Sequence, residues 1–321
     1  MERVWWWNLF VIILIFVGGC PNSFGTKSTT TTCGGYDDEY NRTACDTTTS
    51  TCCKQGFSES EGGWGCAPYP NAECCSNGYT ACPEGYRCED VGTGYSVVTT
   101  CKNDAGVEIP GRQVCKPGAP LRTDPVRKNV LILGDSVSIG YTPYVAKQLA
   151  DVALVQHSPW DLRDGGAEET AYGFQCLDVF LRAPNGEEHD IDLVLFNWGL
   201  HNCDPNATTV PGQAGPPSEY ASFLEGIVAR LSAWSARRAP PTKLIMALTS
   251  PWLDDAAKDR VVLTNNAAAA RIANTYDVPT IDLHRPIVSA CGTPPQRSCM
   301  GHEGCWSPHC PSGYEWLANT T

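Results

Sequence analysis

The sequence predicts an α/β fold: three α/β/α layers around a five-stranded parallel sheet, with a small disulfide-rich module in front of it. Two observations lead to this prediction. First, five apolar runs alternate with helical patterns over roughly two hundred residues, which favours a parallel sheet with helices on both faces. Second, ten of the 18 cysteines fall between Cys33 and Cys101, in a segment too poor in aliphatic residues to form an ordinary core.

Charge and cysteine usage restrict the class of protein. The formal net charge of −12 leaves no basic patch to neutralise phosphates, which argues against a nucleic-acid partner, and it fits poorly with an anionic membrane surface. Eighteen cysteines are too many for a reducing cytosol, so the chain is expected to be secreted. Three sequons, at Asn41, Asn206 and Asn319, are compatible with N-glycosylation.

The first residues have the layout of a secretory signal peptide. Arg3 precedes the apolar run Val4–Val17, and the small residues Gly18 and Gly19 follow it. Residues 1–19 are thus the expected signal peptide, with Cys20 at the mature N-terminus after cleavage. The alternative is an uncleaved anchor, but the run is short for a membrane-spanning helix, and no later stretch is suited to crossing a bilayer.

The rest of the chain divides into three parts. Residues 33–101 form the disulfide-rich module, residues 102–127 a proline-rich linker, and residues 128–321 the α/β domain. Strands of that domain are expected at Val130–Leu133, Val152–Gln156, Ile191–Phe196, Lys243–Leu248 and Val278–Ile281. Helices are expected at Ile139–Ala150, Glu169–Arg182, Pro217–Ala236, Ala256–Thr275 and Pro311–Ala318.

The first of these strands ends abruptly at Gly134-Asp135-Ser136. Its apolar residues, Val130–Leu133, have no polar alternation and read as a strand buried on both faces. Ser136 then lies on a strand-to-helix turn, at the edge of the sheet where α/β folds place their active sites. Ser136 is therefore a candidate nucleophile, although Asp and Ser are also ordinary turn residues.

A serine nucleophile needs a base and donors for the developing oxyanion. His309 is the best-placed histidine, because it lies in a loop between the fifth strand and the last helix. The loop after the third strand carries Asn197-Trp198-Gly199-Leu200-His201-Asn202, whose amides are candidate donors or merely cap the turn. Gly165-Gly166 allows a backbone N–H to approach a ligand closely, or makes a tight turn.

The disulfide-rich module resembles a granulin (epithelin) module. The resemblance rests on the doublets Cys52-Cys53 and Cys74-Cys75, on Gly63-Trp64-Gly65-Cys66 and on the run from Cys82 to Cys88. Granulins have two further cysteines, at the positions of Ala67 and Ala81, which are bonded to each other there. The resemblance implies the pairs Cys33–Cys52, Cys45–Cys66, Cys53–Cys74, Cys75–Cys88 and Cys82–Cys101. The module is either a binding module or a stable spacer.

The α/β domain resembles the GDSL-type (SGNH) hydrolases over about Val130 to Leu317, which implies a flavodoxin-like fold. The resemblance rests on Gly134-Asp135-Ser136, Gly165-Gly166, the loop around Gly199, and His309 followed by Gly313-Tyr314. It implies that Ser136 is the nucleophile and His309 the general base. The oxyanion hole would be formed by the Ser136 N–H, by Gly166 or Gly165, and by one side chain of the loop Asn197–Asn202.

Two positions depart from that family's pattern. The usual oxyanion asparagine aligns with His201; Asn202 follows it and is the favoured donor, while Asn197 is a third candidate. The aspartate that usually lies three residues before the catalytic histidine is replaced by Trp306. In serine proteases the loss of this carboxylate lowers kcat by about 10⁴. Glu303 or a backbone carbonyl could orient His309 instead, and Asp135 is a further candidate for a supporting role.

We therefore expect a secreted serine esterase that hydrolyses carboxylic esters through an acyl-enzyme, with short acyl groups such as the O-acetyl groups of carbohydrate as substrate. The expected partner is the ester, on a glycan or a small molecule, and no cofactor or metal is expected. His302, Cys305, His309 and Cys310 have metal-like spacing, but disulfides are the better use of these cysteines outside the cytosol. The alternative function is an inactive or weakly active secreted binding protein with this fold, which Trp306 favours.

Overall fold

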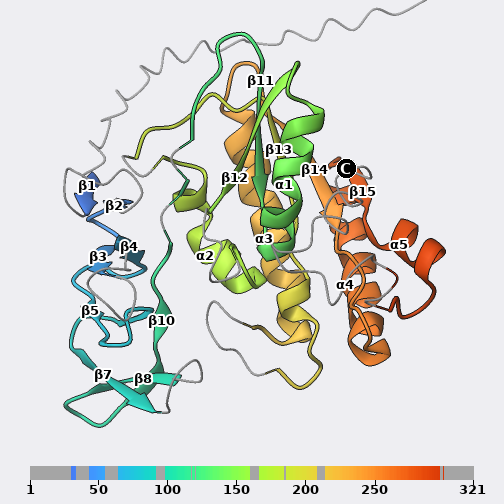
Figure 1. Cartoon of the computed structure of the whole chain (residues 1–321). Coiled ribbons are helices and arrows are strands. Elements are labelled where there is room, and N and C mark those ends of the chain that lie inside the picture. Colours follow the sequence, from blue (N-terminus) through green and yellow to red (C-terminus); the bar gives the residue numbers. More distant parts are fainter. Residues whose placement is uncertain are drawn as a thin grey trace, which may run out of the picture.

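The chain folds into a disulfide-rich module followed by an α/β domain (Figure 1). The computed structural model describes residues 30–33, 43–54, 64–91, 98–116, 118–119, 121–159, 166–183, 186–207, 214–296 and 299. The expected signal peptide, the sequons at Asn41 and Asn319, and the expected helix Pro311–Ala318 lie outside these residues. Asn206 is exposed in a turn. No helix in the described part of the chain has the length and apolarity needed to cross a membrane.

The disulfide-rich module consists of short antiparallel strands. They are β1 Thr30–Cys33, β2 Thr43–Asp46, β3 Thr51–Lys54, β4 Trp64–Ala67, β5 Glu73–Cys74, β6 Thr80–Cys82, β7 Tyr86–Val91, β8 Val98–Asn103, β9 Glu108–Pro110 and β10 Arg112–Gln113. Five disulfides hold them together: Cys33–Cys52, Cys45–Cys66, Cys53–Cys74, Cys75–Cys88 and Cys82–Cys101. These are the five pairs that the granulin resemblance implies.

The two alanines that replace granulin cysteines form a small apolar core. Ala67 and Ala81 are both 0% exposed and cluster with Cys53 and Val114. Val114 comes from the segment expected to be linker, and in that segment β9 and β10 pair with β8 and β6. The paired strands of the module thus extend to Gln113, twelve residues beyond Cys101. The reason is that the backbone groups of β9 and β10 complete sheets that begin with the cysteine-rich strands.

The α/β domain is built on a five-stranded sheet whose strand order is β12-β11-β13-β14-β15. The strands are β11 Lys128–Leu133, β12 Ala153–Ser158, β13 Leu193–Phe196, β14 Lys243–Leu248 and β15 Thr280–Asp282. All adjacent pairs are parallel, as the apolar runs predict. The direction in which the chain adds strands reverses between β11 and β13, and folds of this topology bind ligands at that point, outside the carboxyl ends of the strands.

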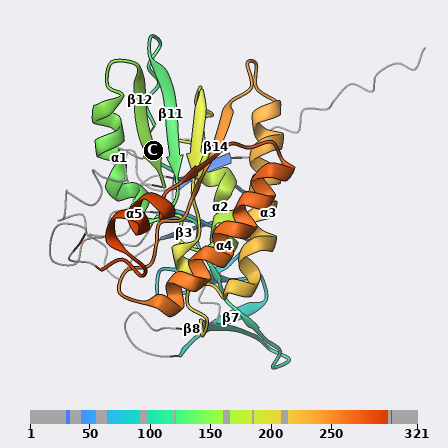
Figure 2. The ribbon, with the colours of Figure 1, turned by 90° about the vertical axis from the view of Figure 1, so that its right-hand side faces the viewer.

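Helices cover both faces of the sheet, as Figure 2 shows. The helices are α1 Ser136–Gln148, α2 Thr170–Phe180, α3 Pro217–Ala236, α4 Ala256–Thr275 and α5 His284–Cys291, with the short 3₁₀ helix η2 at Leu200–Asn202. Leu131 and Leu133 of β11 join the core under α2, α3 and α4, whereas Ile132 joins the core under α1 and α5. Helices α3 and α4 have the predicted bounds, because their apolar stripes are long and uninterrupted.

Helix α5 was not among the helices predicted from the sequence. Pro286 reads as a helix breaker, but it is the third residue of α5, where its missing N–H would have no partner within the helix. The Asp282 carboxylate accepts hydrogen bonds from the backbone N–H groups of His284 and Arg285, both at 3.0 Å, and so caps the first turn. Such an aspartate is a recognisable start signal.

Candidate active site

The Gly134-Asp135-Ser136 turn leads from the buried strand β11 directly into helix α1. Asp135 is the N-cap residue of α1, and its Oδ1 accepts a hydrogen bond from the Val137 N–H at 3.0 Å. Ser136 is the first residue of the helix and is exposed. The serine therefore lies at the positive end of a helix dipole, next to the reversal point of the sheet.

Glycines bring a second loop against this turn. Gly166 lies beside Asp135 in an isolated antiparallel bridge, and the Ala167 N–H donates to the Gly134 carbonyl at 2.8 Å. Gly166 has a φ of +72°, and a Cβ there would lie 2.6 Å from the Gly134 oxygen. Only glycine meets both requirements without strain. The glycine singled out from the sequence is thus a direct neighbour of the candidate nucleophile, whereas Gly165 lies outside the described residues.

The Asp135 carboxylate is an unusual group in this turn. It is 0% exposed, and its Oδ2 has no hydrogen-bond partner among the described residues. Burial raises the pKa of Asp135, while the nearby positive charge of His201 acts in the opposite direction. His201, from the loop after β13, thus lies near the turn that carries Ser136.

The loop after β13 is tied down by its own side chains. Asn197 donates from Nδ2 to the Ala247 carbonyl at 2.6 Å and to Thr249 Oγ1 at 3.3 Å, so its amide is already engaged with the neighbouring strand. Trp198 is buried, and its Nε1–H donates to the Ala167 carbonyl at 3.1 Å. Trp198 thereby connects the loop after β13 to the loop that carries Gly166.

His201 and Asn202 differ in their surroundings. Asn202 is 0% exposed; its Oδ1 accepts from the Thr170 N–H at 3.1 Å and its carbonyl from Asn265 Nδ2 at 3.2 Å. Its Nδ2 is buried, and a Cβ on Gly215 would lie 2.6 Å from it. Asn202 therefore stabilises the start of helix α2. His201 is half-buried and lies nearer the surface.

A second serine–histidine pair, which the sequence did not predict, lies beneath the turn. Ser138 Oγ lies 2.7 Å from the Asp135 carbonyl oxygen and 2.7 Å from His157 Nε2, and His157 Nδ1 lies 2.9 Å from the Pro159 carbonyl oxygen. Ser138 is 1% exposed and His157 2%, so no substrate reaches them. The sequence could have indicated this pair, because His157 lies near the end of a strand expected to be buried, and a buried histidine needs hydrogen-bond partners.

The burial of His157 makes the stability of the protein depend on pH. Burial lowers the pKa of His157 from 6.5 to about 4, so the unfolded chain binds this proton more readily than the folded one. The stabilisation is complete above about pH 6.5 and is lost as the pH falls to about 4, an effect of about 3 kcal/mol. The free energy of urea unfolding, measured at about pH 7.5 and about pH 4, should fall less in the His157→Gln variant than in the wild type. An equal fall in both proteins would show that His157 does not carry this effect.

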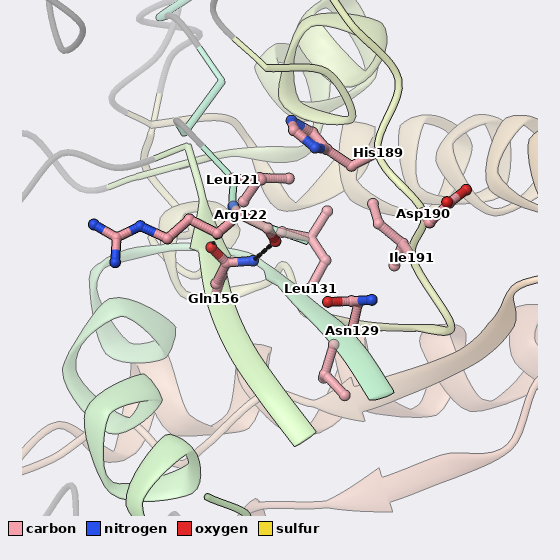
Figure 3. A pocket seen from close by; sticks show the side chains of 9 residues that line it. Leu121, Arg122, Asn129, Leu131, Gln156, His189, Asp190 and Ile191 are labelled. Atoms are coloured by element: carbon pink, nitrogen blue, oxygen red, sulfur yellow. Dashed lines mark hydrogen bonds between the residues drawn. The ribbon is translucent and has the colours of Figure 1, made fainter. Parts of the chain in front are cut away.

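The remaining predicted site residues are not all placed. His309, Trp306 and Glu303 lie outside the described residues. A small pocket lined by residues such as Leu121, Asn129 and His189 lies at the other end of β11, away from Ser136 (Figure 3).

The disulfide-rich module matches the granulin family model over residues 51–94. The chain is 43% identical to mouse (Mus musculus) progranulin over 70 residues, which make up 21% of this chain and 10% of that protein. It is 40% identical to granulin-2 of the carp Cyprinus carpio over 52 residues, or 16% of this chain and 82% of the carp protein. The chain thus spans only a small part of the length of mouse progranulin.

The structure is also similar to solved esterase structures. The acetyl xylan esterase AlAXEase has a TM-score of 0.46 and 13% identity, with 60% of this chain and 96% of that chain covered. An acetylxylan esterase from Geobacillus stearothermophilus has a TM-score of 0.45 and 12% identity, with 61% and 93% covered. A lipase/acylhydrolase from Enterococcus faecalis has a TM-score of 0.43 and 15% identity, with 60% and 92% covered. Because carp granulin-2 is matched over most of its length, this chain belongs to the granulin family through its disulfide-rich module.

Proposed function

We propose that the α/β domain is a serine esterase that hydrolyses carboxylic esters through an acyl-enzyme. The observation that carries the proposal is the meeting of three elements at the reversal point of the sheet. Ser136 lies exposed at the N-terminus of α1, Gly166 lies beside Asp135, and the His201 loop follows β13. This is the arrangement needed for a nucleophile surrounded by donors from other strand ends.

The proposed reaction has two steps. Ser136 Oγ attacks the ester carbonyl carbon while His309 takes the serine proton, and the collapse of the tetrahedral intermediate expels the alcohol, which receives that proton. Water, deprotonated by His309, then attacks the acyl-enzyme and releases the carboxylic acid and the free serine. The backbone N–H groups of Ser136 and Gly166 would stabilise the oxyanion in both steps.

We propose His201, rather than Asn202 or Asn197, as the third oxyanion donor. The Asn197 amide already donates to β14, and the Asn202 side chain lies fully buried against α2. His201 is half-buried, occupies the family's asparagine position and lies close enough to Asp135 to affect its pKa.

The proposed substrate is a short-chain ester, such as an O-acetyl group on a carbohydrate outside the cell. Only Gly134 and Asp135 separate β11 from α1, and Ser136 is exposed, which suits an ester carried on a bulky, accessible molecule. Secretion is part of the proposal, because five disulfides hold the granulin module together and such bonds persist in oxidising compartments. The second candidate, an inactive secreted binding protein, is favoured by Trp306 at the usual aspartate position.

Hydrolysis of a series of p-nitrophenyl esters tests this function. Wild-type protein should cleave the acetyl ester with a higher kcat/KM than the butyryl and octanoyl esters, and the His309→Ala variant should lose this activity. A His302→Ala variant is the matched control, because it removes another histidine from the same stretch of sequence. No hydrolysis of any ester by folded wild-type protein would favour the binding protein instead.

A further inference from the structure

The segment that follows the granulin module is bonded along the α/β domain. Cys115 forms a disulfide with Cys176 of α2, and its backbone also pairs with Cys66 of the module, with N···O distances of 2.9 and 3.1 Å. Farther along, the Gln156 side-chain amide of edge strand β12 exchanges two hydrogen bonds of 2.7 Å with the backbone of Arg122, one of which is drawn in Figure 3. Within the segment 115–122, Cys115 is thus bonded to both parts of the chain and Arg122 to the α/β domain.

Lys116 extends from this segment into the glycine loop of the candidate site. Its side chain is 4% exposed, and its Nζ donates to the Gly166 carbonyl at 2.9 Å and to Glu168 Oε1 at 2.5 Å. The Glu168 side chain is 3% exposed. The desolvation of two buried charges offsets much of their attraction, so such a pair is weak evidence for stability alone. Its position at Gly166 calls for another explanation.

The backbone around Gly166 needs an external restraint. Gly166 has a φ of +72° and Glu168, a non-glycine residue, has a φ of +51°. Glycine adopts such a φ without strain, but a non-glycine residue such as Glu168 keeps it only where the surroundings hold it. Lys116 provides such a restraint at the Gly166 carbonyl, and Glu168 Oε1 accepts a second hydrogen bond from the same ammonium group. The next N–H along, that of Ala167, is held by the Gly134 carbonyl.

We propose that Lys116 is a positioning residue for the oxyanion hole, an inference that rests on the esterase function proposed above. By fixing the peptide group that follows Gly166, the Lys116 ammonium sets the orientation of the Gly166 backbone and hence of its N–H, the proposed donor. The granulin module and the segment 115–122 are therefore part of the working esterase, since they hold Lys116 in place through Cys66 and the Cys115–Cys176 disulfide.

Three variants of the full chain separate positioning from simple stabilisation. Lys116→Met removes the bond to Gly166 and leaves Glu168 buried without its cation. Glu168→Gln removes the ion pair but keeps the Lys116 bond to the Gly166 carbonyl. The double variant Lys116→Met/Glu168→Gln removes both charges. Each is assayed with p-nitrophenyl acetate well below its own Tm, so that all the proteins compared are folded.

The proposal predicts that kcat falls by about 10- to 100-fold in Lys116→Met and in the double variant, with KM within about twofold of the wild type, because the donor is misplaced rather than removed. Glu168→Gln should keep kcat within about threefold, and the double variant should recover Tm relative to Lys116→Met. Recovery of kcat together with Tm in the double variant, or an equal loss of kcat in Glu168→Gln, would overturn positioning while leaving the esterase function intact. If wild-type protein hydrolyses no ester, the esterase function and the positioning role fall together.

Discussion

The Ser136→Ala variant is expected to lose ester hydrolysis almost completely, with kcat lowered by about 10⁶-fold, as when the nucleophile of a serine hydrolase is removed. The physical reason is that the variant has no oxygen atom to form the acyl-enzyme, so that donors alone remain to act on bound substrate and water. Because Ser136 is exposed and its side chain is not the cap of α1, the variant should keep the wild-type Tm. The measurements are initial rates with p-nitrophenyl acetate and thermal unfolding.

Ser222→Ala is the matched control for this variant. Ser222 is an exposed helical serine of α3, and its hydroxyl bonds only the Glu219 carbonyl among the described residues, at 3.0 Å. This variant should hydrolyse the ester at the wild-type rate. Full activity in folded Ser136→Ala would mean that another group is the nucleophile.

Replacement of Gly166 by alanine is expected to lower kcat by about 10²-fold or more. A Cβ at this position would lie 2.6 Å from the Gly134 carbonyl oxygen and 3.1 Å from Ile139 Cδ1. Because the nearest atom belongs to the backbone of the nucleophile turn, relief of the contact must move either the turn or the proposed N–H donor. The variant should also have a lower Tm, since alanine is strained at a φ of +72°.

Gly292→Ala separates the cost of backbone strain from the effect on the site. Gly292 has a φ of +83°, but no atom of the described residues lies within 4 Å of a Cβ placed there. It should show a lower Tm at unchanged kcat. If Gly166→Ala lost only Tm in the same way and kept its kcat, Gly166 would not contribute to the oxyanion hole.

The architecture could be predicted from local patterns in the sequence. Uninterrupted apolar runs such as Leu131–Leu133 identify buried parallel strands, and the long stripes of α3 and α4 identify helices with their ends. The cysteine spacing identified the granulin module. The disulfide pairing came from the resemblance to granulins, because the number of cysteines alone does not determine which ones pair. Helix α5 was not predicted. Pro286 lies in its first turn, and a sequence alone does not distinguish such a proline from one that breaks a helix.

The candidate site could be predicted only where it lies on a sequence motif. Gly134, Asp135, Ser136 and Gly166 belong to short motifs, and the structure brings them together. Lys116 and His157 belong to none, because their importance comes from contacts with residues 50 and 19 positions away. For the same reason the sequence could not rank His201, Asn202 and Asn197. All three can donate a hydrogen bond, and it is their burial and their hydrogen-bond partners in the fold that distinguish them.

Covalent labelling with a fluorophosphonate probe tests most directly whether Ser136 is an activated nucleophile. Folded wild-type protein should react with the probe, and mass spectrometry of its peptides should place the adduct on Ser136. Ser136→Ala should remain unlabelled, His309→Ala should react much more slowly, and heat-unfolded wild-type protein should not react. Absence of labelling in folded wild type, or equal labelling of Ser136→Ala, would contradict the account.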